Sequence, residues 1–177
     1  VSAIEWQKSK LNLIDTSGQG DFIVDTMIAI GAADTALCVV SASDGVQVYT
    51  EKTWEEADAL HMPRMIFVNK MERERADFAV VLDQIHRVLS PQAVAVQLPI
   101  GAESVFEGVI DLVAQKAYRF SDDGREVTVS DVPASLLAAT KEARDKLIEE
   151  VAGSDDELMA AYFDHGTLTD DEVQLGL

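Results

Sequence analysis

Residues 64–72 read Arg-Met-Ile-Phe-Val-Asn-Lys-Met-Glu, a short apolar run that ends in the polar residues Asn69, Lys70 and Glu72. The run is apolar on both faces, which is typical of a parallel strand covered by helices. At its end, an Asn amide can donate to and accept from a purine edge, and a Lys stem can lie flat against a base. A carboxylate two residues after the Lys can accept from the ring N–H and the amine of guanine. The stretch therefore indicates a guanine-reading loop, with an ordinary polar strand end as the alternative.

A second stretch of the same kind comes earlier, where residues 11–22 read Leu-Asn-Leu-Ile-Asp-Thr-Ser-Gly-Gln-Gly-Asp-Phe. Asp15, at the end of the apolar run, is well placed to hold Mg²⁺ directly or through water. Gly18 lets a backbone amide approach a phosphate with no Cβ in the way, and Gln19 can orient an attacking water. Taken alone, the stretch favours a simple turn in which Asp21 caps the next helix.

Short apolar runs alternate with helical patterns through the first hundred residues. Residues 36–40 and 94–98 repeat the character of 11–14 and 65–68, and apolar stripes of helical period lie between the runs, the fullest over 78–89. This order predicts an α/β fold with a mostly parallel sheet and helices on both faces. Open α/β sheets bind ligands at the carboxyl ends of their strands. The two polar stretches together are therefore far more specific than either alone.

The pattern of predicted elements changes near Pro99, from alternating strands and helices to a hairpin followed by helices. Residues 116–120 and 126–129 read as two strands joined by Ser121-Asp122-Asp123-Gly124, a hairpin turn. A helix follows from Pro133 to Ala152, and 154–157 and 169–172 read as capping boxes of two further helices. The acidic clusters at these helix starts fit capping better than metal binding. We place the boundary between two domains at residues 98–101.

Composition narrows the class of protein. The chain has 177 residues, 47% of them apolar, and its 32 acidic against 14 basic residues give a formal net charge of −18. A negative surface opposes direct binding to nucleic acid. Cys38 is the lone cysteine, typical of a small core residue, and the three histidines lack the spacing of metal ligands. No apolar run is long enough to span a membrane. Because the chain begins Val-Ser-Ala, we expect it to be part of a longer protein.

Through these two stretches together, the chain resembles elongation factor G, a translational GTPase. Residues 15–19 correspond to the family motif Asp-Thr-Pro-Gly-His, and residues 69–72 correspond to Asn-Lys-Met-Asp. Residues 44–47, 63–64, 98–101 and 108–112 also fit the family pattern, so the likeness covers nearly the whole chain. The resemblance implies a P-loop-GTPase-like core over residues 1–99 that lacks the P-loop strand, which the family carries upstream of these residues. It implies a small inserted α+β subdomain, strongly acidic here, over residues 100–177.

The resemblance also implies roles in the intact protein. Gln19 would be the catalytic residue that positions water, and Asp15 would hold Mg²⁺ through its water shell. The residues implied to bind the nucleotide are Asp15, Thr16, Gly18, Asn69, Lys70 and Glu72. GTP or GDP and Mg²⁺ are thus the cofactors expected of the intact protein, and none is expected in this chain by itself.

Three departures from the family motifs indicate a paralogue rather than the main translocase. Ser17 stands where Pro is usual, Gln19 stands where the family carries His, and Glu72 replaces the guanine-reading Asp. The added methylene of Glu72 weakens or shifts the preference for guanine. The P-loop motif Gly-x-x-x-x-Gly-Lys-[Ser/Thr] is absent from these 177 residues. We therefore expect no GTP hydrolysis by this chain alone.

The resemblance implies a cytoplasmic protein that acts on the ribosome in a step such as translocation and contacts the ribosomal stalk protein, with no membrane partner. The alternative is a nucleotide-independent interaction module, whose acidic subdomain binds a ribosomal or regulatory protein. Without a P-loop strand, the strands that end at Ile14 and Ser41 lack a neighbour between them. We expect these strands to pair directly, or a second copy of the chain to fill the gap by self-association.

Overall fold

The computed structural model describes residues 1–121 and 124–177. The chain divides into two compact units. Unit 1 comprises Val1–Lys70 and Asp77–Leu89, and unit 2 comprises Met71–Ala76 and Ser90–Leu177. After α3 (Phe78–Val88) the division falls at residues 89–90, whereas the predicted boundary at residues 98–101 overlaps a strand of unit 2, residues Gln97–Ile100. The assignment of residues 1–99 and 100–177 to separate functions stays a prediction.

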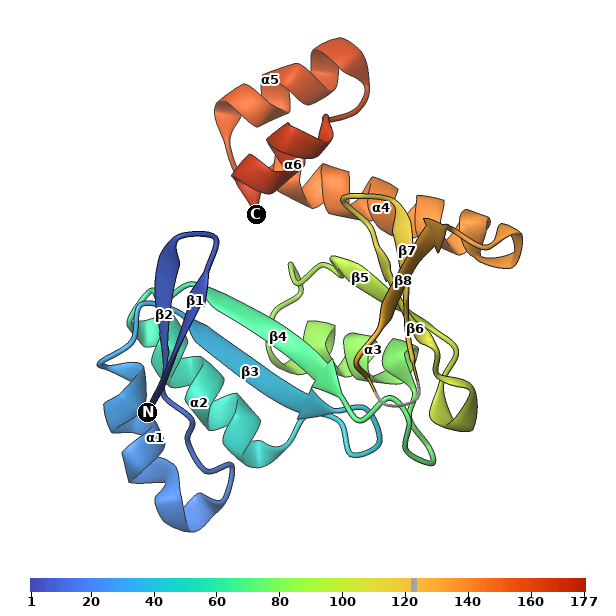
Figure 1. The fold of residues 1–177 in the computed structure, drawn as a ribbon. Helices are drawn as coiled ribbons and strands as arrows, with labels where there is room; N and C mark the ends of the chain where they lie inside the picture. The colour runs from blue at the N-terminus through green and yellow to red at the C-terminus, as the bar shows by residue number, and fades with distance from the viewer. Residues whose placement is uncertain (122–123) are drawn as a thin grey trace. The chain divides into compact units, whose positions relative to one another are not determined.

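The centre of unit 1 is a parallel pair of strands, β3 (Ala36–Ser41) and β4 (Arg64–Asn69), seen side by side in Figure 1. Their register pairs Ala36 with Arg64 and Ser41 with Asn69. Both strands were predicted, and both are β-branched or apolar through their middles, as a buried parallel pair requires. The α/β class predicted from the sequence is confirmed.

Three helices belong to unit 1: α1 (Ile23–Ile30), α2 (Val48–Ala59) and α3 (Phe78–Val88), with a short 3-10 turn, η1 (Gly20–Phe22), before α1. Ile30 of α1 and Ala57 of α2 are buried together with Met62, and Ala36 of β3 packs against them. In α3, Asp77 caps the first turn by accepting from the Val80 N–H at 3.1 Å. Val81 and Ile85 form its buried stripe, as the helical period predicts.

One face of the β3–β4 pair is exposed, whereas the sequence predicted helices on both faces. Leu37 pairs with Met65 and Val39 with Phe67, so these four side chains share one face. Each is more than half exposed, while Val40 on the opposite face is buried. Within the described part of the chain, helices therefore cover one face of this pair, and the other presents an apolar patch to solvent.

The strand predicted over residues 11–14 is present as part of β2 (Ser9–Leu13), but its predicted parallel pairing is wrong. β2 and β1 (Ser2–Trp6) form an antiparallel hairpin, a two-stranded sheet separate from β3–β4. Gln7 and Lys8 both have positive φ, at 46° and 68°, the combination that closes a two-residue hairpin turn. Direct pairing of this strand with β3, one of the two predicted ways to close the sheet, is therefore wrong as well.

Unit 2 contains a four-stranded antiparallel sheet in the order β5-β6-β7-β8. The strands are β5 (Gln97–Ile100), β6 (Gly108–Asp111), β7 (Lys116–Phe120) and β8 (Val127–Asp131), with the 3-10 turn η2 (Glu103–Val105) between the first two. The predicted parallel strand over 94–98 is wrong, because the strand begins at Gln97 and pairs antiparallel with β6. The β7–β8 hairpin is confirmed, while its predicted turn over 121–124 includes residues 122–123, which lie outside the described residues.

Helices follow the sheet in unit 2: η3 (Ala134–Leu136), α4 (Leu137–Ala152), α5 (Asp156–His165) and α6 (Asp170–Gly176). The capping box of α6 is confirmed, because Thr169 accepts from the Glu172 N–H and the Glu172 carboxylate accepts from the Thr169 N–H. The predicted capping box over 154–157 is wrong. Asp155 caps α5 instead, and its carboxylate accepts from the N–H groups of Glu157 and Leu158.

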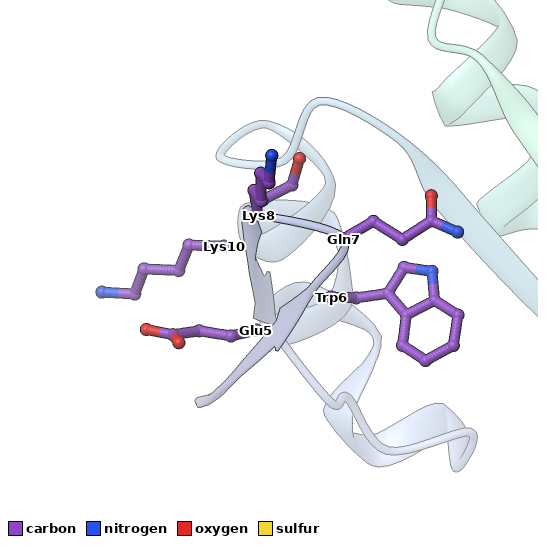
Figure 2. Close-up of a pocket in the computed structure, with 6 residues that line it drawn as sticks. Glu5, Trp6, Gln7, Lys8 and Lys10 are labelled. Atoms are coloured by element: carbon purple, nitrogen blue, oxygen red, sulfur yellow. The ribbon is translucent and has the colours of Figure 1, made fainter.

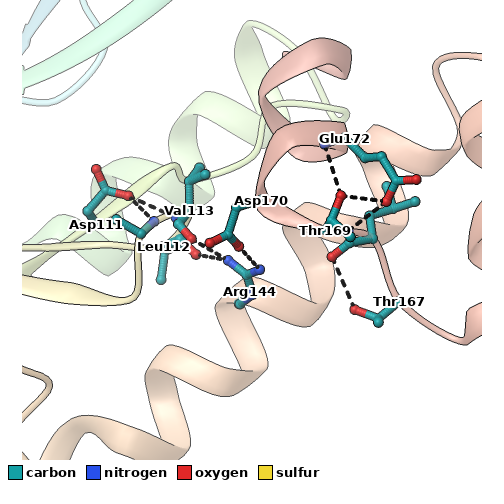
Figure 3. A network of polar contacts seen from close by, with 10 residues as sticks. Asp111, Leu112, Val113, Arg144, Thr167, Thr169, Asp170 and Glu172 are labelled. Carbon is teal, nitrogen blue, oxygen red and sulfur yellow. Dashed lines mark hydrogen bonds and ion pairs between the residues drawn. The ribbon is translucent and has the colours of Figure 1, made fainter.

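Arg144 joins three elements of unit 2 (Figure 3). Its guanidinium donates to the carbonyls of Leu112 and Val113, at 2.8 Å for Val113, and forms an ion pair with Asp170 at 2.6 Å. Its side chain is mostly buried. A charge-assisted contact of this kind fixes α4 against the turn after β6 and against the start of α6.

Among the described residues, no helix combines the length and apolar character needed to cross a bilayer.

We predict that Leu147→Ala destabilises unit 2 by about 2–5 kcal/mol, because Leu147 is 0% exposed in its core and the substitution leaves a cavity. Leu137→Ala, on the same helix, is the matched control, since Leu137 is 54% exposed. Urea unfolding of the three proteins measures both effects. Equal destabilisation by the two substitutions would contradict the position of the core.

We predict a pH dependence for Glu172. Its hydrogen bonds from the backbone and side chain of Thr169 hold the pKa of this carboxyl below its usual value of 4.5. Folding is therefore stabilised by the carboxylate above the unfolded pKa, and this contribution is lost as pH falls through the folded pKa. Glu172→Gln should lower stability at pH 7 and have less effect at pH 3. Unfolding curves at the two pH values test this, with Glu157→Gln as the control for charge alone.

Candidate functional site

The carboxyl ends of β3 and β4 form one edge, from which two loops leave. Ser41 and Asn69 are paired at the last position of the register, and the Ala42 N–H donates to the Asn69 carbonyl at 2.8 Å. The Asp77 N–H donates to the Ala42 carbonyl at 3.2 Å, which ties the start of α3 to the same edge. The predicted guanine-reading residue Asn69 thus stands where the sequence placed it, at a strand end in a parallel sheet.

Asn69 and Lys70 adopt a local geometry that the sequence did not predict. The Asn69 Oδ1 atom accepts from the Lys70 N–H at 2.8 Å, and Lys70 has a φ of 63°. A residue with a Cβ is strained in this left-handed region, by about 1–2 kcal/mol. Six other non-glycine residues in the described chain also have positive φ, among them Gln7 and Lys8 of the β1–β2 turn, so this conformation marks an abrupt turn of the backbone and not by itself a site. Lys70 therefore leaves the strand in a direction that a regular continuation of β4 would not give.

Glu72 lies on the other side of the division between the units. The segment Met71–Ala76 belongs to unit 2, where the Met71 carbonyl accepts from the Glu103 N–H at 2.8 Å. The Glu103 carboxylate accepts from the Arg75 N–H at 2.6 Å. Glu72 itself is exposed. The third predicted base-reading residue is thus held by contacts different from those that hold Asn69 and Lys70.

The loop after β3 carries polar residues for which the sequence predicts no role. The Ser41 hydroxyl donates to the Asp44 carboxylate at 2.7 Å, and the Gln47 amide donates to the Asp44 carbonyl, also at 2.7 Å. Gly45 has a φ of 69°, and its added Cβ would lie 2.0 Å from Oε1 of Gln84, which accepts from the Val46 N–H. The signal available in the sequence was Gly45, since its left-handed backbone favours glycine.

The loop with the remaining predicted residues runs from Asp15 to Gln19, between the hairpin and η1. Asp15, Gly18 and Gln19 are exposed, and Thr16 is half-buried. The buried Thr26 hydroxyl donates to the Ser17 carbonyl at 3.2 Å, which fastens the loop to α1. A Cβ at Gly18 would meet no atom within 4 Å, so the surrounding chain imposes no glycine here. The space beside its backbone is available to a ligand.

The two halves of the predicted site are therefore positioned by different elements. Asn69 and Lys70 lie on the edge of the β3–β4 sheet, whereas Asp15 follows β2, which is not part of that sheet. Gly20 packs against Tyr49 of α2 and so connects the Asp15–Gln19 loop to the helix that follows β3. No group of three His, Cys, Asp or Glu side chains suited to a metal occurs in the described parts of the chain.

A hollow of about 280 Å³ lies at the hairpin turn and not at the predicted site. Its lining residues are Glu5, Trp6, Gln7, Lys8, Ser9 and Lys10. Figure 2 shows Trp6 directed away from Glu5 and Lys10, as the alternation of a strand requires. The hollow contains none of the residues predicted to bind a nucleotide.

Cys38, the lone cysteine, is half-buried, and burial raises the pKa of its thiol, as expected for a core residue.

We predict that Lys70→Gly stabilises unit 1 by about 1 kcal/mol, because glycine relieves the left-handed strain at φ 63°. The same substitution at Lys52, in the middle of α2, should cost about 1 kcal/mol. Thermal unfolding of both variants tests the sign of each change. Destabilisation by Lys70→Gly would show that the backbone at this strand end is not strained.

Comparison with known proteins identifies the family. Residues 1–165 match the family model described as the elongation factor Tu GTP binding domain. A crystal structure of a protein from Thermus thermophilus is similar to this chain, with a TM-score of 0.88 and 29% sequence identity. The match covers 99% of this chain and 26% of that one, so the chain spans about a quarter of its relative's length. The resemblance to the translational GTPases is confirmed: the chain belongs to the family of elongation factor Tu GTP-binding domains.

Proposed function

We propose that the intact protein binds and hydrolyses GTP in a ribosome-associated step such as translocation, and that this chain supplies part of its nucleotide site. The observation that carries the proposal is the position of Asn69 at the carboxyl end of β4, paired with Ser41 of β3, with Lys70 directly after it. Ligands of open α/β sheets bind at this edge. The match of residues 1–165 to a GTP-binding domain supports a guanine nucleotide as that ligand.

The residues of the chain fit a guanine nucleotide and Mg²⁺. Asp15 offers an exposed carboxylate, the ligand type that Mg²⁺ accepts in small number beside its waters. The free space beside the Gly18 backbone suits an approaching phosphate. When bound, Mg²⁺ would neutralise charge on the phosphates during transfer. Thr16 belongs to the same loop, in which Gln19 orients the attacking water.

The base-reading loop determines selectivity in this proposal. Asn69 reads the purine edge and the Lys70 stem lies along the base. Glu72 accepts from guanine with a carboxylate that stands one methylene farther from the backbone than that of Asp. We infer that guanine is still preferred, by a smaller margin than an Asp would give.

We further propose that this 177-residue chain does not hydrolyse GTP by itself. Most of the binding energy for a nucleotide in this class comes from P-loop amides and the P-loop lysine, which contact the phosphates. These 177 residues contain no P-loop motif. The exposed apolar face formed by Leu37, Val39, Met65 and Phe67 supports the view that further elements complete the core in the intact protein.

A nucleotide-independent role of unit 2 is the second candidate. Residues 121–177 contain 15 acidic and 4 basic residues, a net charge of −11. Phe163 on α5 is 77% exposed next to Asp164, and Leu175 on α6 is similarly exposed. Exposed apolar side chains on a strongly acidic segment suit a partner that presents lysines beside an apolar patch. By the resemblance to elongation factor G, we propose the ribosomal stalk protein as this partner.

Titration of the intact protein with fluorescent GDP, GTP and ATP distinguishes the two candidates. Guanine-selective binding in the micromolar range supports the nucleotide site. Absence of binding to all three nucleotides contradicts it and favours the interaction module. The 177-residue chain, titrated in parallel, should bind GTP far more weakly and show turnover no faster than the uncatalysed background.

We predict that Glu72→Asp in the intact protein tightens GDP binding by about tenfold, equivalent to about 1.4 kcal/mol. The shorter carboxylate would restore the reach that suits the guanine ring. Glu74→Asp, in the same exposed loop, is the matched control and should leave the affinity unchanged. Calorimetric titration measures both. An unchanged or weaker affinity of Glu72→Asp would contradict the role of Glu72 as a base reader.

A further inference from the structure

The ring of Tyr49 is seated directly on Gly20. A Cβ added at Gly20 would lie 1.9 Å from the Tyr49 hydroxyl oxygen and 2.0 Å from Cζ, closer than any real contact. Gly20 belongs to the 3-10 turn η1 and lies outside the set of positive-φ glycines. The backbone conformation at this position therefore accepts any residue. What excludes a side chain at residue 20 is the tyrosine ring.

Tyr49 contacts the Asp15–Gly20 segment from an element distant in sequence, unlike the other residues that hold this loop. Thr26 of α1 holds the Ser17 carbonyl, and the Phe22 N–H donates to the Gln19 carbonyl at 3.0 Å. Both of these partners follow the loop directly in sequence. Tyr49 belongs to α2 and comes 29 residues after Gly20, so its contact is a tertiary one.

Tyr49 is 40% exposed, and its position is set by the helix that carries it and by one neighbouring side chain. α2 begins with a capping box, in which Gln47 and Thr50 satisfy each other's backbone N–H groups. The ammonium group of Lys52 lies 5.4 Å from the centre of the Tyr49 ring, within the range of a cation–π contact. The body of α2 is joined to α1 through the buried Ala57 and Ile30. Movement of the ring therefore requires movement of a packed helix or a change of rotamer.

We propose that Tyr49 is a positioning residue for the loop that carries Gln19. This inference rests on the proposed function, because it takes Gln19 as the residue that orients water. Gln19 precedes Gly20 directly, and its side chain is exposed. The ring on Gly20 restricts the backbone next to Gln19, which narrows the range of positions that its amide can reach. Gly20 is required so that the ring can be this close.

The proposal predicts that two different substitutions have the same effect. Tyr49→Ala removes the ring, and Gly20→Ala displaces it, because the new methyl group occupies the space of the hydroxyl and Cζ. In either variant, hydrogen exchange of the two hydrogen-bonded amides of this segment should speed up by about fivefold, as the loop opens more often. These are the Gln19 N–H, which donates to the Ser17 hydroxyl, and the Phe22 N–H, which donates to the Gln19 carbonyl. The double variant should exchange no faster than either single variant, since both changes break one contact.

Three controls make the experiment specific. Tyr49→Phe keeps the ring carbon Cζ over Gly20 and should retain most of the protection. Val48→Ala, at an exposed position one residue earlier in α2, should leave exchange of the loop unchanged. Amides of β3 report on whether a variant is folded, and their protection should be unaltered in each case. Additive effects of the two substitutions, or unchanged exchange in Tyr49→Ala, would overturn the proposal.

Kinetics of the intact protein separate this inference from the proposed function. If Gln19 orients water, Tyr49→Ala should lower kcat by about fivefold and leave the GDP affinity unchanged, with Tyr49→Phe near the original rate. A loss of affinity equal to the loss of kcat would show a general structural role and overturn the proposal. If the intact protein binds no guanine nucleotide, the proposed function fails, and the exchange data still decide whether Tyr49 holds the loop.

Discussion

The parallel pairing of β3 with β4 is the constraint on which the rest of unit 1 depends. The register that ends at Ser41 and Asn69 places both strand ends at one edge. The hydrogen bonds of Ala42 then join the two departing loops to each other and to the start of α3. A shift of β4 by one residue against β3 would turn Asn69 and every other β4 side chain to the opposite face. The geometry at the candidate site is thus a consequence of the apolar pattern of two six-residue strands.

The elements that the sequence predicted well are those whose signals are local. β3, β4 and α3 follow from short apolar runs and a helical stripe, and the cap of α6 follows from Thr169 and Glu172. The hairpin β1–β2 was missed because its turn, Gln7-Lys8, lacks the glycine or asparagine that usually marks such turns. The direction of β5 was missed because an apolar run does not reveal its partner, and here that partner is β6.

The candidate site shows the same division. The sequence identified Asn69 and Lys70 because a polar cluster after a buried strand is a local signal. It did not identify the left-handed backbone at Lys70 or the contacts of Tyr49 and Gln84, which depend on elements distant in sequence. In the sequence, each of these contacts is indicated only by a glycine. Gly20 lies against the Tyr49 ring, and Gly45 lies against the Gln84 amide.

The central claim is that the Asp15–Gln19 loop and the Asn69–Glu72 loop hold one guanine nucleotide in the intact protein. The most direct test is a crystal structure of the intact protein with GDP and Mg²⁺. We predict that the base lies against Asn69 and Lys70 and that Asp15 lies in the outer shell of the metal that binds the phosphates of the same nucleotide. A nucleotide bound elsewhere, or one that contacts only one of the two loops, would contradict it.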